Sequence, residues 1–296
     1  MRQRRRIAAY GMCRDGAGRV LLVRASAHSN CPGSWGLPGG GVKHGEHPRD
    51  ALIREFGEET GLVAEIVGLR AVVSDVEFHP HLAEVWHTDR VLYDVAVTGT
   101  DLRHEADGSS DLAGWVDPAG VRLQPYAGRL LGHPPPDAAE PPESVPPPAG
   151  GRTRQRFAAY GLTTDPAGRI LLTRIAAGYP GAGTWHLPGG GTDFGEGPET
   201  GLLRELVEET GQEGRVTGLL DVTHLHTPQA RGPEGYPMNW HSVRVLYRVA
   251  VDQPSVPSVI EANGGSTAEA AWFDRADLRK LTINASAGRA IAGHGG

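Results

Sequence analysis

The sequence predicts an α+β protein that contains two copies of one domain joined by a proline-rich linker. Two observations support this prediction. Segments of the first half of the 296-residue chain return in the second half in the same order, at first 150 positions later. In each copy, short runs of branched apolar residues surround one segment with clear helix signals. We expect domains over residues 1–131 and 152–296, with the linker over 132–151.

The repeat covers a whole domain and not a short solenoid unit. The sequence AAYG at residues 8–11 returns at 158–161. The sequence RVLY at residues 90–93 returns at 244–247, where the offset has grown to 154. The larger offset predicts a longer loop in the second copy, from Pro228 to Asn239.

Proline is dense between the two copies, over residues 132–151. Such a segment cannot form a helix or an inner strand and favours an extended, semi-rigid spacer. A proline-rich recognition motif for a partner domain is the alternative interpretation.

Two segments of the first copy are predicted to be strands. Residues 19–24 and 90–97 are short, rich in branched apolar side chains and bounded by Gly, Asp or Thr. Both features are typical of strands.

One helix is predicted in each copy, three to four turns long. In the first copy Pro48 stands in the first turn, where a missing N–H costs nothing, and Gly61 stands where a left-handed C-terminal cap is expected. The same pair returns 150 positions later. At about 100° per residue, Leu52, Ile53 and Phe56 are expected to face the core.

Three glutamates of each helix fall on the neighbouring arc, so that their side chains converge. They are Glu55, Glu58 and Glu59 in the first copy and Glu205, Glu208 and Glu209 in the second. Carboxylates this close repel one another, and a cation should compensate them. Oxygen ligands at this density suit Mg²⁺ or Mn²⁺ better than zinc. A solvated acidic helix face is the alternative.

A glycine-rich loop, LPGGG at residues 37–41, precedes the first helix and favours the metal interpretation. Glycine lets the backbone approach a ligand closely and offer a carbonyl to a metal. We therefore expect Gly40, and Gly190 in the second copy, to contact the substrate.

From Gly40 to Leu62 the chain reads G-x5-E-x7-R-E-U-x-E-E-x-G-U, where U is a bulky apolar residue. The pattern occurs again from Gly190 to Gln212, with only the last apolar position replaced. It resembles the Nudix (MutT-like) hydrolases, and the chain looks like a tandem member. The resemblance implies an α/β/α sandwich in each copy, with a mixed sheet between helices. It also implies metal-dependent hydrolysis of a diphosphate bond.

We call this pattern, residues 40–62 and 190–212, the box. The resemblance assigns roles to its residues. In the family, the loop and helix wrap a metal against a diphosphate, a glycine before the box supplies a carbonyl, and the box arginine orients a catalytic glutamate. The implied metal ligands are Gly39, Glu55, Glu58 and Glu59, and Gly189, Glu205, Glu208 and Glu209; the implied catalytic residues are Arg54, Glu55 and Glu58, and Arg204, Glu205 and Glu208. Glu46 and Glu196 are expected to be outer-shell carboxylates.

The base that activates water is either a box glutamate or a glutamate on a later loop. The internal alignment nominates Glu105 and Glu261 for the loop role, with a solvated side chain as the alternative. Arg24 and Arg174 end the strand before the glycine loop and are candidates for holding a phosphate. A surface position is the alternative for both arginines.

The box indicates the bond that is cleaved better than it indicates the substrate. A nucleoside diphosphate linked to another group, such as ADP-ribose or a nucleotide sugar, and a nucleoside triphosphate all fit. A prenyl diphosphate and a non-catalytic nucleotide sensor are the alternatives. Gly57 lies inside the first helix, where it costs about 1 kcal/mol relative to Ala, and Gln212 replaces an apolar residue. Neither touches a carboxylate, so both sites should be competent.

Composition narrows the partners. The net charge of −6 argues against a nucleic-acid coat, although four of the first six residues are arginines. Cys13 and Cys31 form no disulfide or metal pattern, which fits a cytoplasmic setting. No apolar run is long enough to span a membrane. We expect a small-molecule diphosphate substrate, no nucleic acid and no membrane. We also expect the two domains to pair as an intramolecular pseudo-dimer, with a homodimer as a further option.

Overall fold

The computed structural model describes residues 1–99, 101–103, 108–135, 142–146, 153–231, 237–260 and 265–295. These residues form two compact units. The first is Met1–Arg154 together with His226–His241, and the second is Gln155–Leu225 together with Ser242–Gly296.

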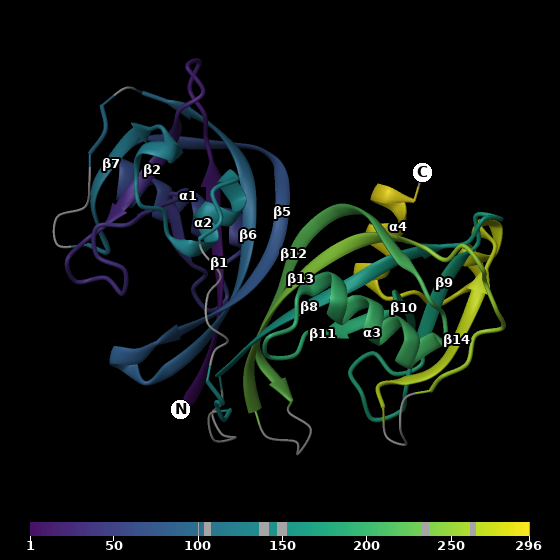
Figure 1. The fold of residues 1–296 in the computed structure, drawn as a ribbon. Helices are drawn as coiled ribbons and strands as arrows, with labels where there is room; N and C mark the ends of the chain where they lie inside the picture. Colours follow the sequence, from purple (N-terminus) through teal and green to yellow (C-terminus); the bar gives the residue numbers. More distant parts are fainter. Residues whose placement is uncertain are drawn as a thin grey trace. The chain divides into compact units, whose positions relative to one another are not determined.

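The first unit contains two sheets among its described residues (Figure 1). Its elements are β1 (Arg2–Met12), β2 (Val20–Ala25), β3 (Trp35–Gly36), β4 (Gly39–Gly41), α1 (Pro48–Thr60), β5 (Val63–His79), η1 (Pro80–Leu82), β6 (Glu84–Thr98), β7 (Ser110–Val116), η2 (Pro118–Gly120) and α2 (Pro125–Leu131). One sheet has the order β4-β1-β6-β5, in which β1 and β6 run parallel and the other pairs antiparallel. The other sheet has the order β3-β2-β7.

The second half of the chain repeats this order of elements, except that its described residues include no counterpart of η1. They are β8 (Thr153–Thr164), β9 (Ile170–Ile175), β10 (Trp185–His186), β11 (Gly189–Gly191), α3 (Pro198–Thr210), β12 (Arg215–Arg231), β13 (Pro237–Ala250), β14 (Thr267–Phe273), η3 (Arg275–Lys280) and α4 (Ala285–His294). Here the strands join into one sheet along β10-β9-β8-β13-β12, with β11 on β8 and β14 on β9.

The central strand of the first unit places helices on both faces of the mixed sheet. A Cβ added at Gly11 would lie 3.1 Å from the ring of Phe56 on α1, so this side of β1 faces α1. The neighbouring Tyr10 packs against Tyr126 on α2, with ring centroids 4.9 Å apart. Successive side chains of a strand point to opposite faces. The expected mixed sheet between helices is confirmed.

The caps of the first helix are those expected from the sequence. Pro48 begins α1, and Gly61 ends it with φ 70° in the left-handed region while its N–H donates to the carbonyl of Gly57. Leu52 and Phe56 are fully buried. The expectation for Ile53 is wrong, since 47% of this residue is exposed. The buried stripe instead extends to Glu59, whose carboxylate bonds the glycine loop.

Some element boundaries differ from those expected. The predicted strands 19–24 and 90–97 correspond to β2 and to the longer β6. The predicted loop from Pro228 to Asn239 is wrong in extent, because β12 continues to Arg231 and β13 begins at Pro237. Backbone pairing along the hairpin replaces most of the loop.

Gln212 fills the place of an apolar residue and is buried to 1% exposure. Its amide nitrogen donates to Ser255 Oγ at 2.8 Å, and its amide oxygen accepts from the Ser255 N–H at 2.9 Å. These bonds satisfy the buried amide, as a buried polar group requires.

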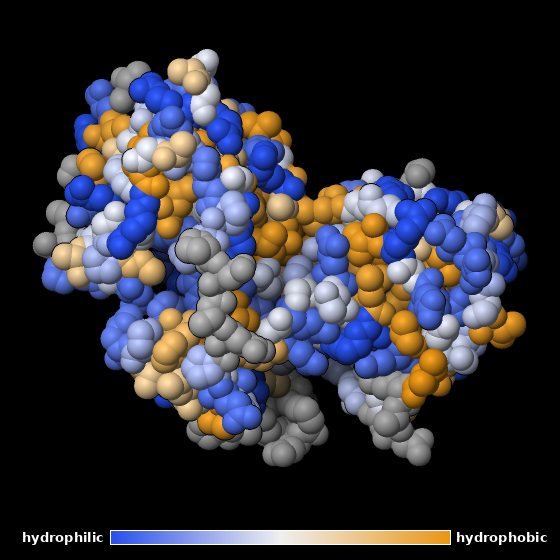
Figure 2. All heavy atoms as spheres, in the orientation of Figure 1, coloured by the Kyte–Doolittle hydropathy of each residue, from blue (hydrophilic) through white to orange (hydrophobic). Residues whose placement is uncertain are grey.

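Polar and apolar side chains are interspersed on the surface seen in Figure 2. Within the described residues, no helix is both long and apolar enough to cross a membrane.

Candidate active sites

Each unit holds its glycine loop against its first strand. Gly39 pairs with Tyr10 in β1 and has φ 136°, a conformation that disfavours any other residue. A Cβ at this position would collide with the carbonyl oxygen of Ala9. Gly189 has φ 129° and would meet Ala159 in the same way. The two loops therefore need glycine at these positions.

The helix carboxylates lie directly on this loop. In the first unit Glu55 is so close to Gly40 that an added Cβ would lie 2.5 Å from Glu55 Oε2. The backbone N–H of Gly39 donates to Glu59 Oε2 at 2.9 Å, and Ser109 Oγ donates to Glu59 Oε1 at 3.4 Å. Glu59 thus ties the loop to the helix.

Arg54 lies at the centre of the acidic group in the first unit. Its Nε and Nη2 each lie 2.9 Å from an oxygen of Glu46, and its Nη1 contacts Glu55 and, at 3.4 Å, Glu58. Its Nη2 also donates to the carbonyl of Gly41 at 3.2 Å. Arg54 thus joins Glu46 on the loop to Glu55 and Glu58 on the helix.

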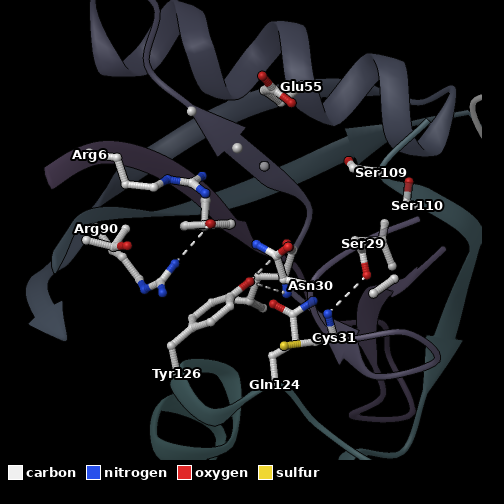
Figure 3. Close-up of a pocket in the computed structure, with 18 of the residues that line it drawn as sticks. Arg6, Ser29, Asn30, Cys31, Glu55, Arg90, Ser109, Ser110, Gln124 and Tyr126 are labelled. Atoms are coloured by element: carbon white, nitrogen blue, oxygen red, sulfur yellow. Dashed lines mark hydrogen bonds between the residues drawn. The ribbon is translucent and has the colours of Figure 1, made fainter. Parts of the chain in front are cut away.

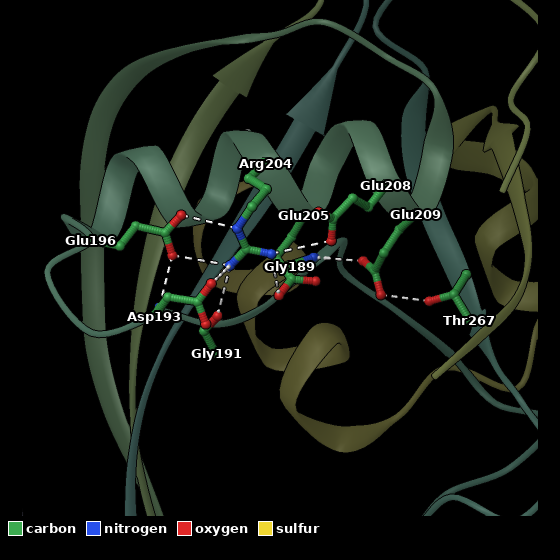
Figure 4. A network of polar contacts seen from close by, with 9 residues as sticks. All are labelled: Gly189, Gly191, Asp193, Glu196, Arg204, Glu205, Glu208, Glu209 and Thr267. Carbon is green, nitrogen blue, oxygen red and sulfur yellow. Dashed lines mark hydrogen bonds and ion pairs between the residues drawn. The ribbon is translucent and has the colours of Figure 1, made fainter. Parts of the chain in front are cut away.

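The second unit repeats this network (Figure 4). Arg204 forms a two-bond ion pair with Glu196, in which both distances are 3.0 Å. Its Nη1 lies 3.2 Å from Glu205 and 3.1 Å from Glu208. The N–H of Gly189 donates to Glu209 Oε2 at 2.8 Å, and the hydroxyl of Thr267 donates to the other oxygen of Glu209.

The box of each unit contains more carboxylates than guanidinium groups. One guanidinium faces three carboxylates, and a fourth carboxylate accepts a hydrogen bond from the glycine loop. The guanidinium stands between the carboxylates, and no three Asp, Glu, His or Cys side chains of the described residues are grouped as metal ligands. The donors are nevertheless all oxygen, and their surplus negative charge fits a hard divalent cation.

Burial and charge shift several pKa values at these boxes. The hydrogen bonds from Arg54 hold the pKa of Glu46 below its usual value, and the acids around Arg54 and Arg204 raise the pKa of both guanidinium groups. Burial raises the pKa of Glu205 even though Arg204 opposes this shift. The arginines therefore remain cationic.

A cavity of about 390 Å³ opens beside the box of the first unit (Figure 3). Its wall includes Glu55, Glu59 and the loop Gly39–Gly41. Arg6 on β1 also lines the cavity, and its Nη2 would lie 3.9 Å from a Cβ at Gly41. Arg156 stands against Gly191 in the second unit in the same way.

These two arginines were missed by the sequence reasoning. Their only signal is the repeated strand in which both lie, two residues before the repeated AAYG. The arginines expected to hold phosphate lie elsewhere. Arg24 pairs with Asp111 at 2.7 Å, and Arg174 pairs with Glu269 at 2.7 Å, both on partly exposed strand surfaces. The phosphate role of Arg24 and Arg174 stays a prediction.

The loop glutamates nominated from the sequence, Glu105 and Glu261, lie outside the described residues. Their catalytic role also stays a prediction.

Comparison with known proteins identifies the family. The NUDIX domain model matches the chain twice, over residues 4–131 and 154–292. The chain belongs to the NUDIX domain family. Because the match is double, it is a tandem member.

Curated NUDIX relatives resemble short parts of the chain. Nudix hydrolase 25 of Arabidopsis thaliana is 51% identical over 47 residues, which is 16% of this chain and 27% of that protein. The putative 8-oxo-dGTP diphosphatase 3 of Mycobacterium tuberculosis is 43% identical over 63 residues, 21% of this chain and 29% of that protein. The ADP-ribose pyrophosphatase of Methanocaldococcus jannaschii is 31% identical over 85 residues, 29% of this chain and 47% of that protein. The chain thus spans less than half of each.

Solved NUDIX structures also match the chain, each over a length close to that of one domain. The MutT protein of Methanosarcina mazei has 24% identity and a TM-score of 0.37, covering 44% of this chain and 91% of its own. The NUDIX domain of Shewanella oneidensis NrtR, complexed with ADP ribose, has 22% identity and a TM-score of 0.39, covering 47% of this chain and 85% of its own.

Proposed function

We propose that the protein is a divalent-metal-dependent pyrophosphohydrolase with two active sites. It cleaves a diphosphate bond in a nucleoside diphosphate linked to another group, of the ADP-ribose, nucleotide-sugar or nucleoside-triphosphate type. The observation that carries this proposal is the repetition of one network. In both units the box arginine joins three glutamates, while two helix carboxylates pack on the glycine loop.

The donor set supports Mg²⁺ or Mn²⁺ as the cofactor. Gly39, Glu55, Glu58 and Glu59 would hold it in the first unit, and Gly189, Glu205, Glu208 and Glu209 in the second. A bound divalent ion supplies charge neutralisation for the diphosphate and lowers the pKa of a bound water. Since Arg54 and Arg204 already share the carboxylates, they would set the orientation of Glu55 and Glu205.

The more exposed helix glutamate is suited to handle the proton of the attacking water. The side chain of Glu58 is 46% exposed and that of Glu208 is 42% exposed, whereas Glu55 and Glu205 are much less exposed. A carboxylate that reaches solvent can accept this proton and release it. The assay of Glu105→Gln and Glu261→Gln decides whether a loop glutamate accepts this proton instead.

Arg6 and Arg156 are suited to orient the phosphates. Each guanidinium stands at the last glycine of its loop, next to the carboxylates. A guanidinium matches phosphate oxygens with two parallel bonds. The guanidinium and the metal held by the carboxylates would then be two positive groups that hold the anionic diphosphate together.

The relatives support a nucleotide substrate. The matched proteins include an ADP-ribose pyrophosphatase and a putative 8-oxo-dGTP diphosphatase, and a matched structure holds ADP ribose. The matches are partial, so the choice among these substrates rests on assay.

The test is a panel of diphosphate compounds assayed with Mg²⁺ or Mn²⁺. The variants are Glu58→Gln, Glu208→Gln, the double variant, Glu105→Gln and Glu261→Gln, with the exposed Glu65→Gln as the control. Each single helix variant should silence one site and spare the other, and the double variant should lose about 10²- to 10⁴-fold in rate. If activity survives in the double variant but is lost in the loop variants, the base is a loop glutamate, Glu105 or Glu261. No turnover of any compound with metal refutes the proposal.

A further inference from the structure

The cavity of the first unit contains two buried polar atoms that have no hydrogen-bond partner among the described residues. They are Glu77 Oε1 and Ser110 Oγ. Both residues line the cavity that also borders the glycine loop. Buried polar groups are normally paired, so an open buried carboxylate oxygen in a cavity marks a place for a donor.

Arg90 lines the same cavity and is paired with Asp75, a carboxylate that Arg129 also contacts at 3.0 Å. Arg90 is 5% exposed and forms a two-bond ion pair with Asp75, at 3.0 and 3.1 Å. It also donates to the hydroxyl of Tyr10 at 3.0 Å and lies over the ring of Tyr126 at 4.0 Å. These contacts fix the Arg90 guanidinium in the wall of the cavity.

Glu77 makes this part of the cavity unfavourable to further negative charge. Burial, and then the charge of Asp75, raises the pKa of Glu77, against the effect of Arg90. As a carboxylate it would accept an N–H or O–H donor, and as an acid it would share a proton with a neutral group. Both forms favour an uncharged, hydrogen-bonding part of a ligand.

The second half of the chain carries different residues at these positions. With the 150-residue offset of the preceding helix, Asp75 corresponds to Leu225 and Glu77 to Thr227. The counterpart of Arg90 is Arg244, which has no ion-pair partner among the described residues of its unit. Arg244 donates to Ser242 Oγ at 3.5 Å and to Ser286 Oγ at 3.3 Å, and it lies 5.9 Å from the centroid of the Tyr160 ring.

The two units also differ in the volume of two side chains near the box. In the first unit Gly36 leaves room for Tyr126, since an added Cβ would lie 2.8 Å from the tyrosine hydroxyl. In the second unit the repeat places His186 at the position of Gly36, and Ser286 lies where Tyr126 stands. The surroundings of the two boxes thus differ in side-chain volume and charge, although the boxes are alike.

We propose that Glu77 is the specificity-determining residue of the first site, where it binds an N–H or O–H donor on the uncharged part of the substrate. The second site lacks this carboxyl and therefore prefers different substrates. The inference rests on the proposed function for the position of the phosphates. The donor is carried by the nucleobase or by a sugar hydroxyl.

The experiment measures the first site alone, in a Glu208→Gln background. Glu77→Gln and Glu77→Thr are compared with the parent, and Glu65→Gln, at an exposed position of the same strand, is the control. One compound series keeps the ribose and diphosphate and varies the N–H groups of the base. The other keeps the base and varies the sugar hydroxyls. The series that loses its discrimination identifies the source of the donor.

Removal of the carboxyl should act on binding and not on chemistry. We expect Glu77→Thr to raise KM for the preferred compound by about tenfold or more, with kcat within about threefold. Glu77→Gln keeps an acceptor oxygen and should lose less. A lower kcat with an unchanged KM, or no change of KM for any compound in either variant, overturns the inference.

A binding measurement separates this inference from the proposed function. Calorimetry measures nucleoside monophosphates of the same series on the chain that carries both Glu58→Gln and Glu208→Gln, with and without the Glu77 substitutions. If no diphosphate compound is hydrolysed by the parent but the substitutions still weaken binding about tenfold, the proposed function fails and the inference stands. Equal affinity with and without the Glu77 carboxyl refutes it, and Glu77→Gln decides if the threonine variant does not fold.

Discussion

Arg54 and Glu46 form a two-bond ion pair in which both nitrogen–oxygen distances are 2.9 Å. The same guanidinium reaches Glu55 and Glu58 on the helix. Glu46, which was expected to be an outer metal carboxylate, therefore holds the arginine that in turn holds the helix glutamates.

The pair predicts that Arg54→Lys impairs the first site. Lysine is a point charge that cannot bridge Glu46 and Glu55 with a planar fork. In the Glu208→Gln background, we expect kcat to fall about tenfold to a hundredfold, a loss typical of groups that orient ligands. The measurement is steady-state kinetics with Mg²⁺.

A double-variant cycle checks the chain of contacts. If Arg54 acts through its pairing with Glu46, Glu46→Gln combined with Arg54→Lys should cost little more than the worse single variant. Strictly additive losses would contradict the relationship.

Gly39→Ala should destabilise the first unit. The φ of 136° is unfavourable for alanine, and the new Cβ would meet the carbonyl of Ala9. We expect a loss of about 2 to 4 kcal/mol in the free energy of unfolding. Hydrogen exchange of β1 and β4 amides reports it, and protection at the parent level would show that the loop tolerates a side chain.

Gly57→Ala should have the opposite effect. Gly57 lies inside α1, and an added Cβ would find no atom nearer than 3.9 Å. The second unit carries Val207 at this position. We expect about 0.5 to 1 kcal/mol of stabilisation from helix propensity, seen as a higher melting temperature of the first unit. A lower melting temperature would mean that the helix needs glycine there.

Asp89 should make the first unit sensitive to acid. The carboxylate is fully buried and bonded to Arg5 at 2.9 Å and Ser74 at 2.8 Å. Burial alone would raise its pKa, but the neighbouring His87, whose Nε2 lies 3.4 Å from Asp89 Oδ1, and the charge of Arg5 lower it. This stabilisation is therefore present above about pH 4, the unfolded pKa, and is lost as the pH falls through the lower folded pKa.

The second unit provides the comparison, since Val243 stands at the position of Asp89 and is fully buried. Hydrogen exchange should show β6 losing protection below about pH 4 before β13 does. Asp89→Asn should cost about 3 kcal/mol at pH 7, because it removes the charge that compensates Arg5, and should flatten the pH dependence of β6. Equal acid sensitivity of β6 and β13 would contradict this account.

Single residues and their near neighbours in the sequence were sufficient to predict α1 and the glycine loop before it. Pro48 and Gly61 mark the ends of α1 because a missing N–H and a left-handed φ are properties of single residues. Ile53 shows the limit of such reasoning. An apolar side chain next to Leu52 on the helix wheel is exposed, and the buried stripe includes the carboxylate of Glu59.

The two helices with their caps, the glycine loops and the acidic box were determined by the sequence alone, because each depends on residues close together in the chain. The repeat was determined by the sequence as well, because the same segments return in the same order. Only the tertiary structure brought Arg6 against Gly41 and left Glu77 open beside Arg90, which is paired with Asp75. Those residues lie on β1, β4, β5 and β6, and their side chains meet only when the sheet forms. Whether a charged side chain in the cavity has a partner of opposite charge depends on how these strands pack. The spacing of residues within one segment does not show this.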